Sequence, residues 1–188
     1  IQGYTGSPVI KAALAFSALV FQRPGEVRHM EWEEVNWGDS QWEIPSRKMK
    51  LRRAHIVPLS GQSMQLLEAL HELTGKSAYV FPSARGWRRP LSENGVRTAL
   101  RSMGYENETM TPHGFRSMAR TILNEVLGYR ADWIEHQLAL YVNDSTGGSY
   151  NRTAYLEGRR QMMQGWADYL EHLRDAARGL VQFRVRPK

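Results

Sequence analysis

The 188-residue sequence contains no cysteine. This absence excludes disulfide bonds, thiolate-bound zinc and cysteine nucleophiles, and it suits a reducing compartment. The sequence also lacks a run of 18 apolar residues, a secretory signal, a Walker loop and the paired-histidine spacing of a zinc site. We therefore expect no membrane-spanning helix, no bound metal and no cofactor.

Positive charge is in excess and is unevenly distributed. The chain has 25 Lys and Arg against 19 Asp and Glu, a net charge of +6, which favours binding to a polyanion. Two loops are dense in this charge, residues 47–53 and residues 85–89 around Trp87. Such loops neutralise DNA phosphates regardless of base sequence, although a solvated hairpin tip explains the first one equally well. We predict DNA contacts at Lys48, Arg52, Arg53, Arg85, Arg88 and Arg89.

The hydrophobic pattern predicts one domain of the α+β class, mainly helical with a small antiparallel β-sheet. The length suits one domain, and no repeat or linker divides the chain. Apolar residues alternate across 35–44 and recur at 56–58, which indicates two strands, and 79–82 is a third candidate. Helical periodicity and capping signals predict helices at 8–21, 24–30, 61–74, 92–103, 112–127, 130–139 and 153–178.

The segment from Thr111 to Arg116 is the one most suggestive of chemistry. Its Thr-Pro pair favours a helix start, with Thr111 as the N-cap. His113 and Arg116 are three residues apart, so they would share one face of that helix. An imidazole, a guanidinium and a helix N-terminus together suit a phosphate group. The alternative is a partly buried histidine beside a surface arginine.

Three further positions carry candidate groups. Arg23 precedes a proline-initiated turn, where Glu26 could orient its guanidinium, although a solvated arginine at an ordinary helix start fits the same pattern. Lys50, in the connection between two strands, could deliver a proton into a groove or be one more solvated cation. Tyr150 follows a polar, glycine-containing loop and is either a nucleophile activated by nearby cations or a packing residue.

In their order along the chain, these segments resemble the catalytic domain of the tyrosine recombinases, and more narrowly the prophage integrases. The resemblance runs from about Gly3 to Leu173. It rests on five matches: Arg23-Pro24-Gly25-Glu26, Lys50 in a basic hairpin, His113-Gly114-Phe115-Arg116, Gln137-Leu138-Ala139 and Tyr150-Asn151-Arg152. It implies site-specific cleavage and rejoining of DNA, for integration or excision of a prophage or mobile element, without a metal or other cofactor.

The resemblance also implies a role for each matched residue. Arg23 and Arg116 would clamp the scissile phosphate, with His113 beside them. Lys50 would protonate the leaving 5′-oxygen, and Tyr150 would attack the phosphorus to form a 3′-phosphotyrosyl bond. Two guanidiniums and an imidazole stabilise the negative charge that develops in such a transition state.

One position departs from the family pattern. A histidine or tryptophan usually follows Gln-Leu-Ala, whereas this chain has Leu140, which offers no hydrogen-bond donor. His136, one helical turn earlier, could compensate, but we interpret it as a surface histidine. Glu26 matches the family's acidic partner of the first arginine. We expect slowed cleavage. The alternatives are a DNA-binding remnant that has lost activity or, if the motifs are coincidental, a general nucleic-acid binder.

The resemblance finally implies an organisation and partners. Family members carry core-binding and arm-binding domains before the catalytic one, and neither fits before Gly3. We therefore expect residues 1–188 to be a single catalytic domain that ends in a basic tail at 174–188. The implied partner is double-stranded DNA, on which family members assemble as tetramers. We expect a monomer when no DNA is bound, located in the cytoplasm at the bacterial nucleoid, with no membrane partner.

Overall fold

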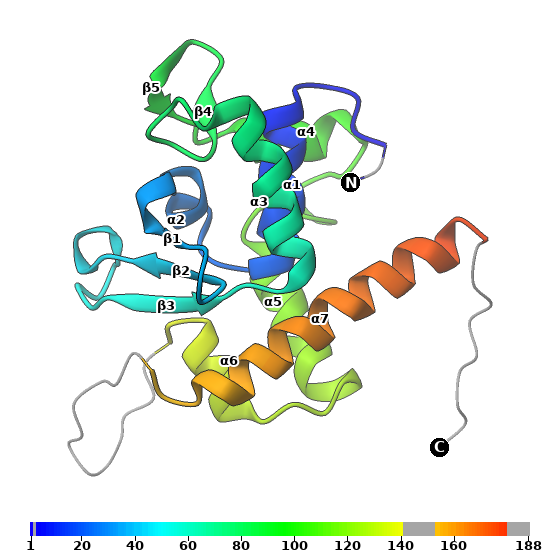
Figure 1. Ribbon diagram of the computed structural model, residues 1–188. Helices are drawn as coiled ribbons and strands as arrows, with labels where there is room; N and C mark the ends of the chain where they lie inside the picture. The colour runs from blue at the N-terminus through cyan, green and yellow to red at the C-terminus, as the bar shows by residue number, and fades with distance from the viewer. Residues whose placement is uncertain (2, 141–152, 180–188) are drawn as a thin grey trace.

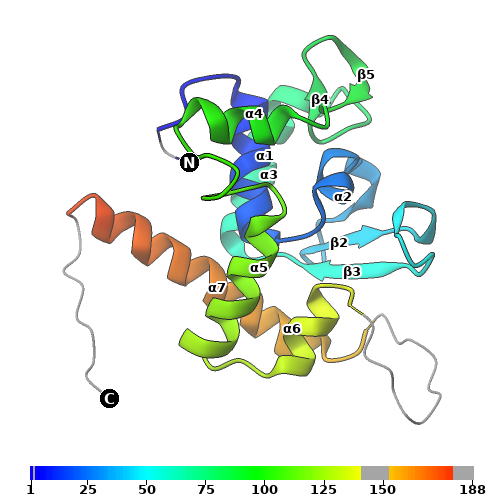
Figure 2. The same cartoon turned by 180° about the vertical axis from the view of Figure 1, so that it is seen from behind.

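The computed structural model describes residues 1, 3–140 and 153–179 (Figures 1 and 2). This part of the chain is mainly helical with small antiparallel sheets, which confirms the predicted α+β class. None of its helices is long and apolar enough to cross a membrane. The α-helices are α1 (Pro8–Val20), α2 (Pro24–Arg28), α3 (Gly61–Thr74), α4 (Gly95–Ser102), α5 (Gly114–Thr121), α6 (Ala131–Gln137) and α7 (Leu156–Ala177). The strands are β1 (Val35–Asn36), β2 (Gln41–Ile44), β3 (His55–Pro58), β4 (Pro82–Ser83) and β5 (Gly86–Pro90).

Strands β1, β2 and β3 form one antiparallel sheet in chain order. In its register Trp42 lies opposite Val35 on one side and Val57 on the other. The Trp42 side chain is fully buried, and its ring centroid lies 6.0 Å from that of Phe16 in α1. The sheet therefore shares the larger hydrophobic core with α1, α3 and α4.

A second hydrophobic core lies between α5, α6 and α7. Trp166 of α7 is fully buried there, meets the ring of Phe21 edge-on at 6.0 Å, and donates its indole N–H to the Ala18 carbonyl at 2.9 Å. These contacts anchor α7 to the end of α1. Both views show α5, α6 and the first half of α7 gathered at that end of the molecule (Figures 1 and 2).

Three regions differ from the prediction. The single strand expected across 35–44 is divided into β1 and β2, which pair antiparallel across a turn at 37–40. The helix expected at 112–127 begins at Gly114, and His113, which precedes it, makes no side-chain capping bond. The Thr111 hydroxyl accepts the Gly114 N–H at 3.0 Å, the kind of bond expected of a capping threonine. Beyond α5 the chain continues as a π-helix, η3 (Ile122–Val126). Residues 85–89, expected as a loop, largely form β5, while 79–82 contributes an isolated bridge at Tyr79 and the start of β4.

Candidate active site

Arg23 lies where α1 gives way to α2. Pro24 takes the first position of α2, as its fixed φ favours, and Glu26 follows within the same turn. The Glu26 carboxylate accepts the Arg23 main-chain N–H at 3.0 Å and its guanidinium at 2.8 Å. The side chain of Glu26 is only 4% exposed, so the ion pair is largely shielded from water. The contact expected between Glu26 and Arg23 is therefore present.

Arg116 of α5 is buried, and two main-chain carbonyls bind its guanidinium. One Nη donates to the Phe21 carbonyl at 3.0 Å, and the other donates to the Leu138 carbonyl at 2.6 Å. Burial, followed by the charge of Arg23, lowers the pKa of Arg116 to about 10, and Glu26 opposes this shift. Arg116 therefore stays charged at neutral pH, and the alternative of a surface arginine is wrong.

The carboxyl end of α6 is a Schellman turn. The Ala139 N–H donates to the His136 carbonyl at 3.0 Å, and the Leu140 N–H donates to the Glu135 carbonyl at 3.0 Å. Ala139 has a φ of 49°, in the left-handed region that disfavours every residue except glycine. The chain therefore leaves the helix at Ala139, and the carbonyls of Leu138 and Ala139 are directed toward partners outside the helix.

Those helix-end carbonyls are the acceptors for the two arginines. Leu138 supplies the carbonyl to Arg116, and the Ala139 carbonyl lies 3.4 Å from Nη2 of Arg23. The third acceptor, the Phe21 carbonyl, follows α1 at a residue that is also left-handed, with a φ of 42°. Cations are favoured at helix carboxyl ends because the unpaired carbonyls there carry partial negative charge.

The arrangement suits a phosphodiester. A guanidinium carries five N–H donors. The contacts described above leave part of this donor capacity on both Arg23 and Arg116 for a ligand. Planar guanidiniums bind the oxygens of a phosphate in pairs and remain charged. Because their positions are fixed before a ligand arrives, they can stabilise developing negative charge with little reorganisation.

The other predicted catalytic residues are not joined to this pair. Lys50 lies in the exposed turn that precedes β3, and His113 is the exposed N-cap of α5. Within the described ranges, no hydrogen bond or ion pair links either side chain to the two arginines. Leu140 is 36% exposed. Tyr150 lies outside the described residues.

Most of the predicted DNA-binding residues are exposed, and Lys48 differs from the rest. Its ammonium lies 3.1 Å from the Glu31 carboxylate, also contacts the buried Glu34 carboxylate, and donates to the His29 carbonyl at 2.8 Å. Lys48 thus stabilises the fold of this region and is not available to a phosphate. The side chains that do face solvent are Arg52, Arg53, Arg85, Arg88 and Arg89.

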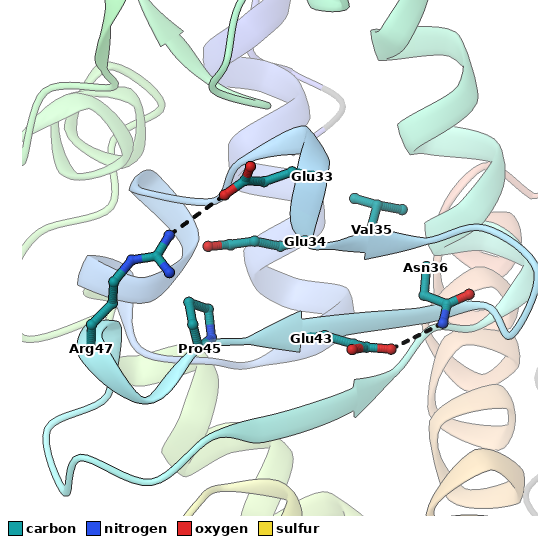
Figure 3. Close-up of a pocket in the computed structure, with 7 residues that line it drawn as sticks. All are labelled: Glu33, Glu34, Val35, Asn36, Glu43, Pro45 and Arg47. Carbon is teal, nitrogen blue, oxygen red and sulfur yellow. Dashed lines mark hydrogen bonds and ion pairs between the residues drawn. The ribbon is translucent and has the colours of Figure 1, made fainter.

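A pocket of about 450 Å³ beside the β1–β2 pair is acidic (Figure 3). Its lining includes the carboxylates of Glu33, Glu34 and Glu43, and Arg47 lies 3.5 Å from Glu33. Asn36 donates to the Glu43 carboxylate at 3.0 Å. The three carboxylates outnumber the two cations bound to them, Arg47 and Lys48, so the field in this pocket opposes the approach of a phosphate. None of the residues that line this pocket belongs to the candidate active site.

A buried polar network surrounds Gln137 and was not predicted from the sequence. Arg159 of α7 is fully buried and donates from Nε and Nη2 to Gln137 Oε1 at 3.0 and 2.8 Å. His55 of β3 is 1% exposed, and its Nε2 lies 3.2 Å from the Gln137 carbonyl. One signal was present: Arg159 precedes Met162, Met163 and Trp166 at helical spacing, which puts it on the apolar face of α7.

The prediction for His136 is wrong. This residue is 8% exposed, with its ring centroid 6.0 Å from that of His55 and 6.2 Å from that of Tyr155. It lies on the face of α6 that packs against the rest of the domain, which the short polar segment did not reveal. Burial, then the charges of Arg159 and His136, lower the pKa of His55 well below 6.5.

Comparison with known proteins identifies relatives of this chain. Residues 6–157 match the Phage integrase family. The chain is 37% identical over 185 residues to the integrase of Enterobacteria phage P4, and 41% identical over 168 residues to the prophage integrase IntZ of Escherichia coli K12. These matches cover 91% and 89% of this chain, but only 42% and 41% of the relatives. The chain thus spans about two fifths of their length.

Solved structures share the fold. The catalytic core of lambda integrase matches with a TM-score of 0.57 at 24% identity, over 77% of this chain and 87% of that one. A lambda integrase tetramer bound to a Holliday junction matches with a TM-score of 0.56 at 20% identity, over 76% of this chain and 44% of that one.

His55 predicts a pH dependence of stability. Because its pKa is depressed in the folded chain, only the unfolded chain takes up this proton as the pH falls below about 6.5. The free energy of unfolding should therefore decrease by up to about 1.4 kcal/mol per pH unit below that point. His55→Gln keeps an N–H donor for Gln137 but does not titrate, so urea denaturation from pH 4.5 to 8 should show a shallower loss.

His71→Gln is the matched control, because His71 is exposed. It should retain the wild-type pH dependence. An equally steep loss of stability in His55→Gln and in wild type would contradict the assignment.

Proposed function

The chain belongs to the phage integrase family, and from this premise we propose that it cleaves and rejoins double-stranded DNA at specific sites through a 3′-phosphotyrosyl bond. The observation that carries the proposal is the pairing of Arg23 and Arg116 on helix-end carbonyls. Residues 1–188 would act as the catalytic domain, in the integration or excision of a prophage or another mobile element.

The proposed reaction exchanges one phosphate ester bond for another. The Tyr150 hydroxyl releases its proton to solvent, a loss that nearby cations favour, and its oxygen attacks the scissile phosphorus as the bond from phosphorus to the 5′-oxygen breaks. Lys50 donates a proton to that oxygen, while Arg23, Arg116 and His113 stabilise the negative charge on the non-bridging oxygens. Since one phosphate ester bond forms as another breaks, the freed 5′-hydroxyl can reverse the step without an external energy source.

The exposed basic residues support DNA as the partner. The turn between β2 and β3 carries Arg52 and Arg53, and the β4–β5 hairpin carries Arg85, Arg88 and Arg89. Both segments project from the side of the molecule opposite the carboxyl end of α7 (Figures 1 and 2). We propose that they track the phosphate backbone and, by likeness to the lambda integrase tetramer, that the protein assembles as a tetramer on DNA from a free monomer.

A DNA-binding remnant with impaired catalysis is the second candidate, and Leu140 is the observation that favours it. Its main-chain N–H completes the Schellman turn by donating to the Glu135 carbonyl at 3.0 Å, but its side chain offers no donor to a phosphate. Loss of one such donor typically slows an enzyme by about 10²–10³-fold. The presence of leucine at position 140 is therefore compatible either with slowed cleavage or with complete loss of cleavage, and an assay has to distinguish the two.

Covalent capture tests the proposed chemistry. The substrate is a pool of 5′-labelled nicked duplexes with randomised sequence on the 5′ side of the nick, so that a short fragment leaves after cleavage and traps the intermediate. Wild type should give a protein–DNA adduct that survives denaturation, with Tyr150 as the modified residue by mass spectrometry. Tyr150→Phe should give no adduct while still binding duplex DNA, because phenylalanine has no attacking oxygen.

Leu140→His in the same assay separates the two candidates. A histidine adds a donor, so capture should become up to about 10²-fold faster. Capture by Leu140→His but not by wild type would identify a remnant silenced at this position, and no gain would show that Leu140 does not limit cleavage. If neither protein captures DNA that it binds, the proposed cleavage reaction is wrong.

Salt-dependent DNA binding tests the proposed surface. Arg88→Ala should reduce the slope of log Kd against log salt concentration by about 1, because one phosphate contact is lost. Arg174→Ala is the matched control: it also removes one guanidinium, but near the carboxyl end of α7, where Glu171 and Asp175 bind it. Fluorescence anisotropy on a labelled duplex measures both slopes. An equal reduction in the two variants would contradict the proposed surface.

A further inference from the structure

Arg159 joins three elements that meet beside the arginine pair. It is the fourth residue of α7, is 0% exposed, and donates two hydrogen bonds to the side chain of Gln137, the last residue of α6. Its Nη2 also donates to the Ile56 carbonyl of β3. Both views show α6, β3 and the start of α7 side by side (Figures 1 and 2). Arg159 therefore fixes the end of α6 against the sheet and α7.

The main chain of Gln137 is held as firmly as its side chain. Its carbonyl accepts Nε2 of Gln22 at 2.7 Å and lies 3.2 Å from Nε2 of His55. The next two carbonyls along the chain are those that bind Arg116 and Arg23. Because peptide groups are planar and these residues form one tight turn, a displacement of Gln137 moves both acceptors.

The chemistry of Arg159 is unusual for its position. It lies on the apolar face of α7 with Met162 and Met163, and it donates to oxygens of Gln137 and Ile56. Burying a guanidinium costs solvation free energy that a methionine of similar length would not lose. The guanidinium instead fixes the relative position of α6 and β3, because its planar group donates to Gln137 and to Ile56 at once.

We propose that Arg159 is a positioning residue for the arginine pair and acts through Gln137. It does not touch the phosphate; it sets where the Leu138 and Ala139 carbonyls lie, and these set where Arg116 and Arg23 point. The inference rests on the proposed function only in its effect on strand cleavage. Its effect on the two arginines is a property of the protein without DNA.

Arg159→Met tests the inference, with Arg160→Met as the matched control. The neighbouring Arg160 loses the same charge from the same helix, but its guanidinium bonds the Asp39 carbonyl at the surface. In single-turnover capture at saturating nicked DNA, Arg159→Met should be slower by on the order of 10²-fold, as expected for a displacement of about 1 Å, with an unchanged Kd. Arg160→Met should behave as wild type.

Two variants of Gln137 distinguish a loss of positioning from a loss of folding. Gln137→Glu keeps an acceptor for Arg159 and should retain the wild-type rate, whereas Gln137→Met removes the acceptor and should be slow. Combining Gln137→Met with Arg159→Met should add little further loss, because both act through one contact. Additive losses, or a slow Gln137→Glu variant, would overturn the inference.

NMR of the arginine Nε–H groups without DNA separates this inference from the proposed function. The Arg116 and Arg23 signals should shift in Gln137→Met and Arg159→Met, and should stay in place in Arg160→Met. Unchanged signals in folded Arg159→Met would overturn the positioning role. If wild type captures no DNA, the proposed function fails, while the same signals still decide whether Arg159 positions the pair.

Discussion

The candidate site depends on the guanidinium of Arg116, which donates hydrogen bonds to main-chain carbonyls at the carboxyl ends of two helices. The Phe21 carbonyl follows α1 and the Leu138 carbonyl ends α6. Each helix end has unpaired carbonyls and a partial negative charge, so a buried cation satisfies both. The local backbone bears a strain for this arrangement, since Phe21 and Ala139 both have left-handed conformations without being glycine. The packing of Trp166 against Phe21 holds the first of these ends in place.

The cations fixed by these carbonyls differ from the cations at the surface. The inner cations, Arg23 and Arg116, are fixed by main-chain carbonyls and by Glu26 before any ligand binds. The outer ones, on the β2–β3 turn and the β4–β5 hairpin, face solvent and are placed to meet a polyanion. A separate group of acidic residues lines the pocket beside β1 and β2, where Glu34 also binds Lys48. Such a division supports rigid chemistry at the centre and adaptable electrostatic contact around it.

The sequence predicted what depends on local spacing and missed what depends on tertiary contact. Arg23 and Glu26 share one turn, so their pairing followed from three-residue spacing, and the bounds of α3 followed from periodicity. Lys48 was misjudged because its partner Glu34 lies in a different element, well before it in the chain. His136 was misjudged because it is buried despite its polarity. Arg159 was not singled out at all, since a network across α6, α7 and β3 could not be inferred from single segments. The strand β5 was missed because its residues are mostly exposed and charged.

The central claim is that main-chain carbonyls immobilise the Arg116 guanidinium in the protein without DNA. The most direct measurement is the rate of rotation about its Nε–Cζ bond, read by NMR from the Nη signals. We predict slow rotation, with separate signals for the two Nη groups of Arg116, beside averaged signals for an exposed residue such as Arg85. Fast, averaged rotation at Arg116 as well would contradict the claim.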